Sequence, residues 1–261
     1  MEDLVSNERL RAAMLESRHS VTRLAEELSV DPKTIHRWLG GRVPHPRHRF
    51  ALASALSQEE EYLWPSVNRS TPNSYASVAE LVAAYPFRAD VDAAHWWSMI
   101  IKARQQIDLL GYTLYFLPQQ HPQLIPVLQE KCAAGCTVRL VLADPGSQFV
   151  RLRELEEQDP ITLTARIQTS LRAFRPLVQD CTGAELRYQD APLYSSVFRF
   201  DDEMFVTPHL YATPGHRAPL LHLRRLGPNG LFSRFASHFE SIWATTTPAD
   251  DSSSLPVHLG A

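Results

Sequence analysis

The sequence predicts two folded parts, an all-α part followed by an α/β part with a mixed sheet. Up to about residue 62 the apolar residues recur at helical spacing, whereas after about residue 85 β-rich runs alternate with helical segments. Between these parts the chain is rich in Ser, Pro and Asn without apolar periodicity, which is typical of a linker. The expected parts are an all-α domain over residues 1–67, a linker over 68–85, an α/β domain over 86–246 and a flexible tail over 247–261.

Composition and charge indicate an ordinary globular protein. The 261 residues are 44% hydrophobic and 21% charged, and the net charge is -3. This balance argues against a uniformly basic nucleic-acid-binding protein but permits a local basic patch. The N-terminus lacks the pattern of a signal peptide, and no apolar run has the length of a membrane span, so we expect a cytoplasmic protein without a membrane partner.

The cysteines do not form a metal-binding or disulfide pattern. Cys132, Cys136 and Cys181 include no C-x-x-C pair. We therefore expect reduced thiols, no metal site and no cofactor.

Two helices in close succession are predicted within the N-terminal part. Residues 21–28 have helical apolar spacing, and a short turn follows at Ser29 and Val30. Asp31 is a good N-cap and Pro32 suits the first position of the next helix. Two helices joined by so short a turn form a helix-turn-helix.

The second of these helices is predicted to have a buried face and a polar face. Ile35, Trp38 and Leu39 share the face that we expect in the core. Residues 32–49 contain five Lys or Arg and no acid, which suits phosphate contacts, and recognition helices enter the major groove by their N-terminal residues. The alternative is a small helical bundle with a charged, solvated face. The expected DNA-binding residues are Lys33, Thr34, His36, Arg37, Arg42, Arg47 and Arg49.

The same segment resembles a known family of regulators. The run VTRLAEELSVDPKTIHRWLGGRVP, residues 21–44, is similar to the Cro/C1-type (XRE) helix-turn-helix of bacterial regulators, especially actinobacterial ones that continue into Tyr-Leu-Trp-Pro like residues 62–65. The resemblance covers about residues 6–66, and Thr22 stands where the family often has a phosphate-contacting Gln. It implies a nucleoid-associated homodimer on a double-stranded DNA operator, with half-sites about one helical turn apart.

The second part is predicted to be a largely buried mixed sheet covered by helices. Runs rich in β-branched and aromatic residues predict the strands, and apolar spacing of three and four predicts the helices. Trp96, Trp97, Phe239 and Trp243 are expected in the core. The expected strands are 107–117, 137–143, 184–188, 196–200, 203–207 and 219–226, and the expected helices are 123–134, 150–158, 163–178 and 232–243.

The order of these elements resembles the phospholipase D-like fold. The supporting segments are residues 107–112, GCTVRLVLAD at 135–144, a hairpin with an acidic turn at 201–203, and FASHFESIW at 235–243. No glycine-rich phosphate loop, G-x-S-x-G or H-E-x-x-H motif occurs. The resemblance covers roughly residues 86–245.

The resemblance implies that catalysis has been lost. Active members carry His-x-Lys-x4-Asp on the first strand of the hairpin, with the His as nucleophile and the Lys as phosphate clamp. In this chain Tyr194 stands at the His position, Ser196 at the Lys position and Asp201 at the Asp position, and we find no second such motif. Because tyrosine is a weak nucleophile and serine carries no charge, we expect no catalytic residues.

A ligand pocket is still expected at the C-terminal ends of the strands, where α/β sheets commonly bind ligands. His222, Arg224 and Arg199 could supply positive charge to an anionic ligand. His209 could instead be a hydrogen-bonded structural residue, and the arginines could be solvated edge residues. The candidate ligand-binding residues are Tyr112, Asp144, Tyr194, Ser196, His209, Tyr211, His222 and Arg224.

Together these features predict a sequence-specific DNA-binding transcriptional regulator. Its catalytically inactive phospholipase D-like domain would sense a small-molecule effector, phosphorylated or not, or form the homodimer. The first alternative is a phosphodiesterase or nuclease that uses His209 or His222 as an unorthodox nucleophile and is targeted to DNA by the helical part. The second is an adaptor whose second domain only contacts another protein.

Overall fold

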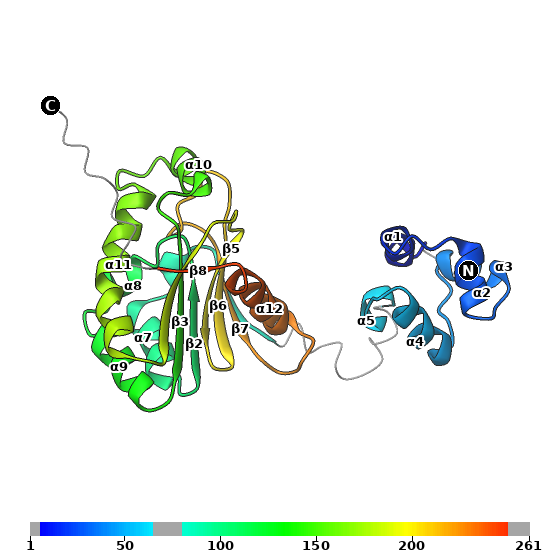
Figure 1. Ribbon diagram of the computed structural model, residues 1–261, viewed down its shortest axis with the longest axis horizontal. Coiled ribbons are helices and arrows are strands. Elements are labelled where there is room, and N and C mark those ends of the chain that lie inside the picture. The colour runs from blue at the N-terminus through cyan, green and yellow to red at the C-terminus, as the bar shows by residue number, and fades with distance from the viewer. Residues whose placement is uncertain (1–5, 65–79, 250–261) are drawn as a thin grey trace. The chain divides into compact units, whose positions relative to one another are not determined.

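The computed structural model describes residues 6–64 and 80–249. Contacts within the chain divide it into two compact units, residues 1–76 and 77–261 (Figure 1). The division falls inside the segment that the sequence predicts as a linker.

The described part of the first unit consists of helices around one apolar core. Each of the five helices contributes at least one buried apolar side chain, including Leu10, Leu24, Ile35, Leu52 and Leu63, all 0% exposed. The helices are α1 (Glu8–Glu16), α2 (Val21–Glu27), α3 (Pro32–Leu39), α4 (Pro46–Ala55) and α5 (Glu60–Leu63).

Side-chain caps determine where the first helices begin. The Ser20 hydroxyl accepts the N–H of Arg23 at the start of α2. The Asp31 carboxylate accepts the N–H of Lys33 at 2.7 Å at the start of α3, and Pro32 occupies the first turn. Such caps stabilise a helix by about 1 kcal/mol each. The predicted cap at Asp31 and the predicted first helical residue Pro32 are confirmed.

The second unit is built on a mixed eight-stranded sheet of order β1-β7-β6-β5-β2-β3-β4-β8. The central strands β2, β3 and β4 are parallel, and the remaining neighbours pair antiparallel. The predicted mixed α/β class is therefore confirmed for this unit. The strands are β1 (Leu81–Tyr85), β2 (Gln106–Leu110), β3 (Thr137–Ala143), β4 (Ala184–Gln189), β5 (Ser195–Phe200), β6 (Glu203–Pro208), β7 (Leu220–Arg224) and β8 (Thr247–Pro248).

Helices cover both faces of this sheet, with α12 on one face and α7, α9 and α11 on the other (Figure 1). Alternate residues of a strand face opposite sides, so Leu140 packs in the larger core while Val141 packs under α12. The predicted core positions Trp96 and Phe239 are each 1% exposed, and Trp97 and Trp243 pack against the cores. The helices are α7 (Ala93–Lys102), α8 (Phe116–Gln120), α9 (Leu124–Ala133), α10 (Gln148–Glu157), α11 (Leu163–Asp180) and α12 (Leu231–Trp243).

Two strands lie where the sequence predicts a linker and a tail. β1 falls in the predicted linker and pairs with β7, and β8 falls in the predicted tail and pairs with β4. The predictions are therefore wrong for residues 81–85 and 247–248. Both strands are short edge strands that are held by partners far away in the sequence, which local patterns do not report.

The strand predicted over residues 107–117 ends at Leu110. The chain then turns at Gly111, where an added Cβ would lie 3.1 Å from Leu114 and 3.2 Å from the Ser196 hydroxyl. Leu114 adopts a left-handed φ of 49°, and α8 begins at Phe116. The apolar run continues past the strand because Leu114 in the turn and Leu117 in α8 are also buried in the core. Apolar residues alone therefore do not mark the end of β2.

Among the residues that the structure describes, no helix is long and apolar enough to cross a bilayer.

Candidate functional site

The first candidate site is the polar face of α3. Ile35, Trp38 and Leu39 are buried as predicted, while Lys33, His36 and Arg37 are exposed and Thr34 is half-buried. No carboxylate in the described part of the chain forms an ion pair with Lys33 or Arg37. Together with Arg42 and Arg47, which are also exposed, these side chains form what we term the α3 basic surface: Lys33, Thr34, His36, Arg37, Arg42 and Arg47.

A ring contact connects α3 with α4. Trp38 packs against His48, with ring centroids 5.5 Å apart, and Arg47 donates to the His48 ring at 3.1 Å. Burial and the nearby charges of Arg47 and His45 lower the pKa of His48. Arg47 is thus held, through His48, near the C-terminal end of α3.

Arg49 has a structural position that differs from the prediction. Its Nε donates to Glu60 at 2.5 Å and its Nη1 donates to the Pro44 carbonyl at 3.1 Å. The side chain is only 14% exposed. Arg49 therefore joins α4 to α5. Because its guanidinium is already paired with Glu60, we leave Arg49 out of the α3 basic surface, although the sequence predicts that it contacts DNA.

The second candidate site is a cavity of about 240 Å³ in the sheet unit. It lies beyond the C-terminal end of β2, where the Gly111–Phe116 segment meets the end of α10, the start of α11 and the loop after β6. Three of the predicted ligand-binding residues line it, namely Tyr112, Ser196 and His209. The cavity lies at the end of the sheet where the sequence analysis expects a ligand pocket, and ligand binding there stays a prediction.

His209 is fixed by hydrogen bonds on both ring nitrogens. Nδ1 lies 2.9 Å from the Leu193 carbonyl, and Nε2 lies 2.9 Å from the Ser196 hydroxyl. Because a carbonyl can only accept, Nδ1 carries the proton and the Ser196 hydroxyl donates to Nε2. Burial, with smaller contributions from Arg153 and Arg88, lowers the pKa of His209 to about 4 despite the Leu193 bond. The ring is therefore neutral at pH 7.

Arg88 lines the same cavity, and the sequence analysis did not select it. Its guanidinium lies over the Phe116 ring at 3.9 Å from the centroid. No side chain in residues 6–64 or 80–249 pairs with it through a hydrogen bond or an ion pair. Burial, assisted by the charge of Arg166, lowers its pKa to about 10, so Arg88 stays charged at pH 7. Arg88 lies within the predicted α/β domain, in the short turn after β1, but no motif or strand pattern in the sequence singles it out.

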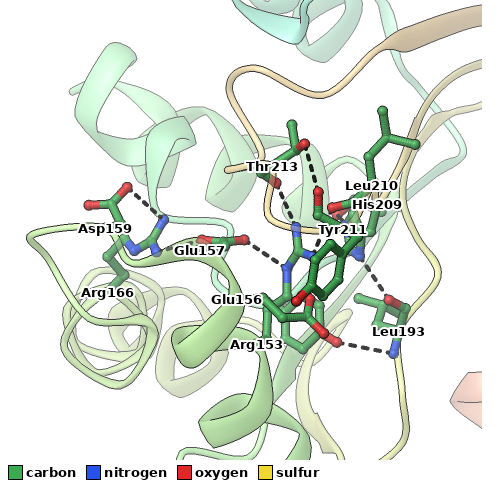
Figure 2. A network of polar contacts seen from close by, with 12 residues as sticks. Arg153, Glu156, Glu157, Asp159, Arg166, Leu193, His209, Leu210, Tyr211 and Thr213 are labelled. Carbon is green, nitrogen blue, oxygen red and sulfur yellow. Dashed lines mark hydrogen bonds and ion pairs between the residues drawn. The ribbon is translucent and has the colours of Figure 1, made fainter.

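A polar network holds the other wall of the cavity (Figure 2). Arg153 donates to Glu157 and Glu156 of α10 at 2.9 Å each and to the carbonyls of Leu210 and Thr213 at 3.0 and 2.6 Å. These bonds fix the loop after His209 on α10.

Glu157 extends this network to Arg166, whose Nη2 donates to it at 2.9 Å. Asp159 lies 3.9 Å from the same guanidinium. The positive charge of Arg166 is therefore balanced by carboxylates, unlike that of Arg88.

The other predicted ligand-binding residues lie outside this cavity. Tyr194 and Tyr211 are 73% and 81% exposed, because both lie in loops beyond the ends of β5 and β6. The Asp144 carboxylate accepts the N–H of Gly146 at 2.7 Å in the turn after β3. The prediction that these three line the cavity is wrong.

His222 and Arg224 belong to a separate cluster on β7. Both pair with Glu203, with 2.8 Å from Arg224 Nε to Glu203. His222 also packs against Phe205 and His95. Arg199, named as a further cation, contacts Asp108 at 3.6 Å. His222, Arg224 and Arg199 therefore do not line the cavity. Glu203 holds the first two and Asp108 holds Arg199.

Asp201, aligned with the Asp of the phospholipase D-like motif, also has a structural role. It accepts the backbone N–H groups of Arg104, Gln105 and Gln106 at 2.7 to 2.9 Å. Although burial opposes ionisation, these bonds hold the pKa of Asp201 below its usual value. Asp201 therefore fixes the N-terminal end of β2, the end opposite to the cavity.

The described side chains contain no cluster of three or more His, Cys, Asp or Glu that could hold a metal ion.

These features define a two-unit protein with a helical unit and a mixed α/β unit that contains a polar cavity. The family model described as a domain of unknown function, DUF5919, matches residues 77–250. Because this match covers more than half of the chain, the protein belongs to that family. No curated protein matches the chain. One similar solved structure is entitled "Structure of TrmBL2, an archaeal chromatin protein, shows a novel mode of DNA binding", with 14% identity, a TM-score of 0.41, and coverage of 83% of this chain and 68% of that one.

Proposed function

We propose that the protein is a sequence-specific, DNA-binding transcriptional regulator that binds an operator as a homodimer. The observation that carries the proposal is α3, which buries one apolar face and exposes Lys33 and Arg37 without acidic partners. A short turn separates it from α2, an arrangement suited to placing α3 in a major groove. The resemblance to the Cro/C1-type helix-turn-helix supports the same proposal.

The charges on the α3 basic surface favour nucleic acid over a protein partner. Unpaired, exposed cations gain most from phosphates, because contact releases the counterions of DNA. Lys33 and Thr34 lie in the first turn of α3, the part of a recognition helix that contacts base edges.

The sheet unit is proposed to sense a small effector and to contribute to dimerisation, without catalysis. The resemblance to the phospholipase D-like fold would place a phosphate-clamping lysine at Ser196, which donates to His209 and carries no charge. The proposal that neither histidine acts as a nucleophile is supported by their contacts, since His209 has both ring nitrogens engaged and His222 is held by Glu203 away from the cavity.

A mobility-shift experiment tests DNA binding. The full chain is titrated onto genomic fragments that include the DNA upstream of its own gene, at several salt concentrations. We expect a salt-sensitive, sequence-selective shift that the double variant Lys33→Ala, Arg37→Ala abolishes.

A matched control is the double variant Lys102→Ala, Arg172→Ala, which removes the same charge from exposed positions of the sheet unit. It should bind like the parent chain. Absence of any selective shift, or full selectivity in the Lys33, Arg37 variant, would refute the proposal.

A further inference from the structure

We propose that the cavity beside Arg88 binds a small hydroxylated monocarboxylate, with Arg88 as the residue that binds its carboxylate group. This identifies the chemical class of effector for the proposed sensor, and only its regulatory consequence rests on the proposed function. The inference depends on the charge of Arg88, on the hydrogen-bonding groups around it and on the size of the cavity.

Arg88 has the geometry of a preformed carboxylate site. The Arg88 guanidinium lies over the Phe116 ring, with its carbon 3.9 Å from the centroid, and no side chain among the described residues accepts a hydrogen bond from its N–H groups. Backbone bonds hold the segment, since the Arg88 N–H donates to the Ala218 carbonyl at 2.7 Å and the Ala89 N–H to the His216 carbonyl at 3.1 Å. A fixed guanidinium fork matches the two oxygens of a carboxylate.

The surrounding charges favour one negative charge on the ligand. Arg166 is balanced by Glu157 at 2.9 Å and Asp159 at 3.9 Å, and His209 is neutral at pH 7. Arg88 also lines this cavity, and no carboxylate of the described residues lies within ion-pair distance of it. A phosphate monoester carries about −1.5 to −2 at pH 7, and its second charge would face Glu157 and Asp159 on the cavity wall.

The neutral groups of the cavity favour ligand hydroxyls. Ser196 gives its proton to His209, so its oxygen keeps lone pairs that can accept from a ligand hydroxyl. Asp159 offers a second acceptor on the wall through Oδ2, which lies 3.9 Å from Arg166, whereas its Oδ1 accepts the Ile161 N–H at 3.0 Å. A ligand with hydroxyls beside its carboxylate would satisfy these acceptors, which an aliphatic acid would leave unpaired at a cost.

The cavity volume limits the size of the ligand. About 240 Å³ lies below the usual range for drug-sized ligands. This space suits a short hydroxy acid.

The position of Arg88 indicates which segment a bound ligand would stabilise. Arg88 follows β1, the strand that the chain enters after residues 65–79. Just before β1, the buried Glu80 carboxylate accepts the N–H groups of Leu226 and Phe232 at 3.2 Å each. A ligand held by Arg88 would therefore stabilise residues 80–88, which contain β1.

Calorimetry and thermal-shift measurements on the full chain test the inference. The probes are glycerate and gluconate as hydroxylated monocarboxylates, propionate as an aliphatic acid, glycerol 3-phosphate as a phosphate monoester, and glycerol as a neutral polyol. We expect saturable binding of glycerate or gluconate that exceeds the binding of the other three. Arg88→Gln should weaken that binding by about ten- to hundredfold, the range for a hydrogen-bonded charge. The control Arg172→Gln, on the exposed side of α11, should bind like the parent chain.

A second variant gives a test that does not depend on Arg88. Ser196→Ala keeps the charge of the cavity but removes the hydroxyl acceptor, so the preference for glycerate over propionate should fall. The inference is overturned if neither hydroxy acid binds, if Arg88→Gln binds like the parent, or if glycerol 3-phosphate binds more tightly. DNA binding is measured separately without ligand. Loss of the mobility shift with intact glycerate binding would refute the regulator alone, and the reverse result would refute the cavity ligand alone.

Discussion

At the scale of single residues, the two candidate sites differ in how their charges are satisfied. On α3, Lys33 and Arg37 are exposed to solvent without partners. On the wall of the cavity in the sheet unit, Arg166 is paired with Glu157, and His209 is held neutral between Leu193 and Ser196. Arg88 lines the same cavity without an ion-pair partner among the described residues, although a partly buried charge without a partner is costly.

The lowered pKa of His209 predicts a pH dependence of stability. In the unfolded chain His titrates near 6.5, whereas His209 in the fold titrates at about 4. As the pH falls from 6.5 to 4, the unfolded state takes up a proton that the folded state does not, so the free energy of unfolding decreases. The decrease reaches about 3 kcal/mol at pH 4. Above pH 6.5 the group is neutral in both states and no stability is lost.

His209→Gln should flatten this dependence in urea unfolding of the sheet unit between pH 4 and 6.5. The exposed His36→Gln serves as the control and should preserve the slope of the parent chain. An unchanged slope in His209→Gln would show that other groups cause the acid destabilisation.

At the scale of elements, local signals determined most helices, but long-range pairing determined the edges of the sheet. α3 begins where Asp31 and Pro32 place it, since a cap acts within a few residues. β3 spans Thr137–Ala143 as predicted, because a strand buried on both faces is a continuous apolar run. β1 and β8 could not be predicted in this way, because each depends on a partner strand that is distant in the sequence.

The junction of β1 and α12 gives a prediction at this scale. A Cβ at Gly230 would overlap the carboxylate of Glu80, which is 0% exposed and accepts the Phe232 N–H near the start of α12. Gly230→Ala should therefore destabilise the sheet unit by about 1–3 kcal/mol, the range for overpacking. Thermal unfolding of the full chain measures the effect.

Gly227→Ala is the matched control for this substitution. A Cβ at Gly227 meets nothing within 4 Å, so the change should stay within about 0.5 kcal/mol. Equal stability of the two variants would contradict the proposed role of Glu80 in anchoring the start of α12.

At the scale of the whole molecule, the net charge of -3 conceals a local concentration of cations. The α3 basic surface contains four Lys or Arg side chains, whereas Arg49 is used inside the helical unit. The net charge of the whole chain therefore does not argue against the proposed nucleic-acid binding, because the exposed cations are concentrated on the α3 basic surface.

The proposed homodimer predicts a steep salt dependence of operator binding. If Lys33, Arg37, Arg42 and Arg47 each contact a phosphate, one chain contributes a slope of about −3.6 in log K against log salt, and a dimer about −7. Fluorescence anisotropy with labelled operator measures the slope, and sedimentation of the complex gives the number of chains. A single chain on the operator with a slope near −3.6 would exclude the homodimer.

The sequence by itself determined the two classes of unit, the buried and polar faces of α3, and the region of the sheet where a pocket lies. These features follow from apolar spacing, caps and strand order, which act over a few residues or through general rules of α/β sheets. The tertiary structure decided which side chains share the cavity. It brought Arg88 beside Ser196 and His209, and it assigned Arg49, Asp201 and His222 to structural contacts. The physical reason is that pairing between side chains depends on distances set by long-range packing, which one-dimensional spacing does not contain.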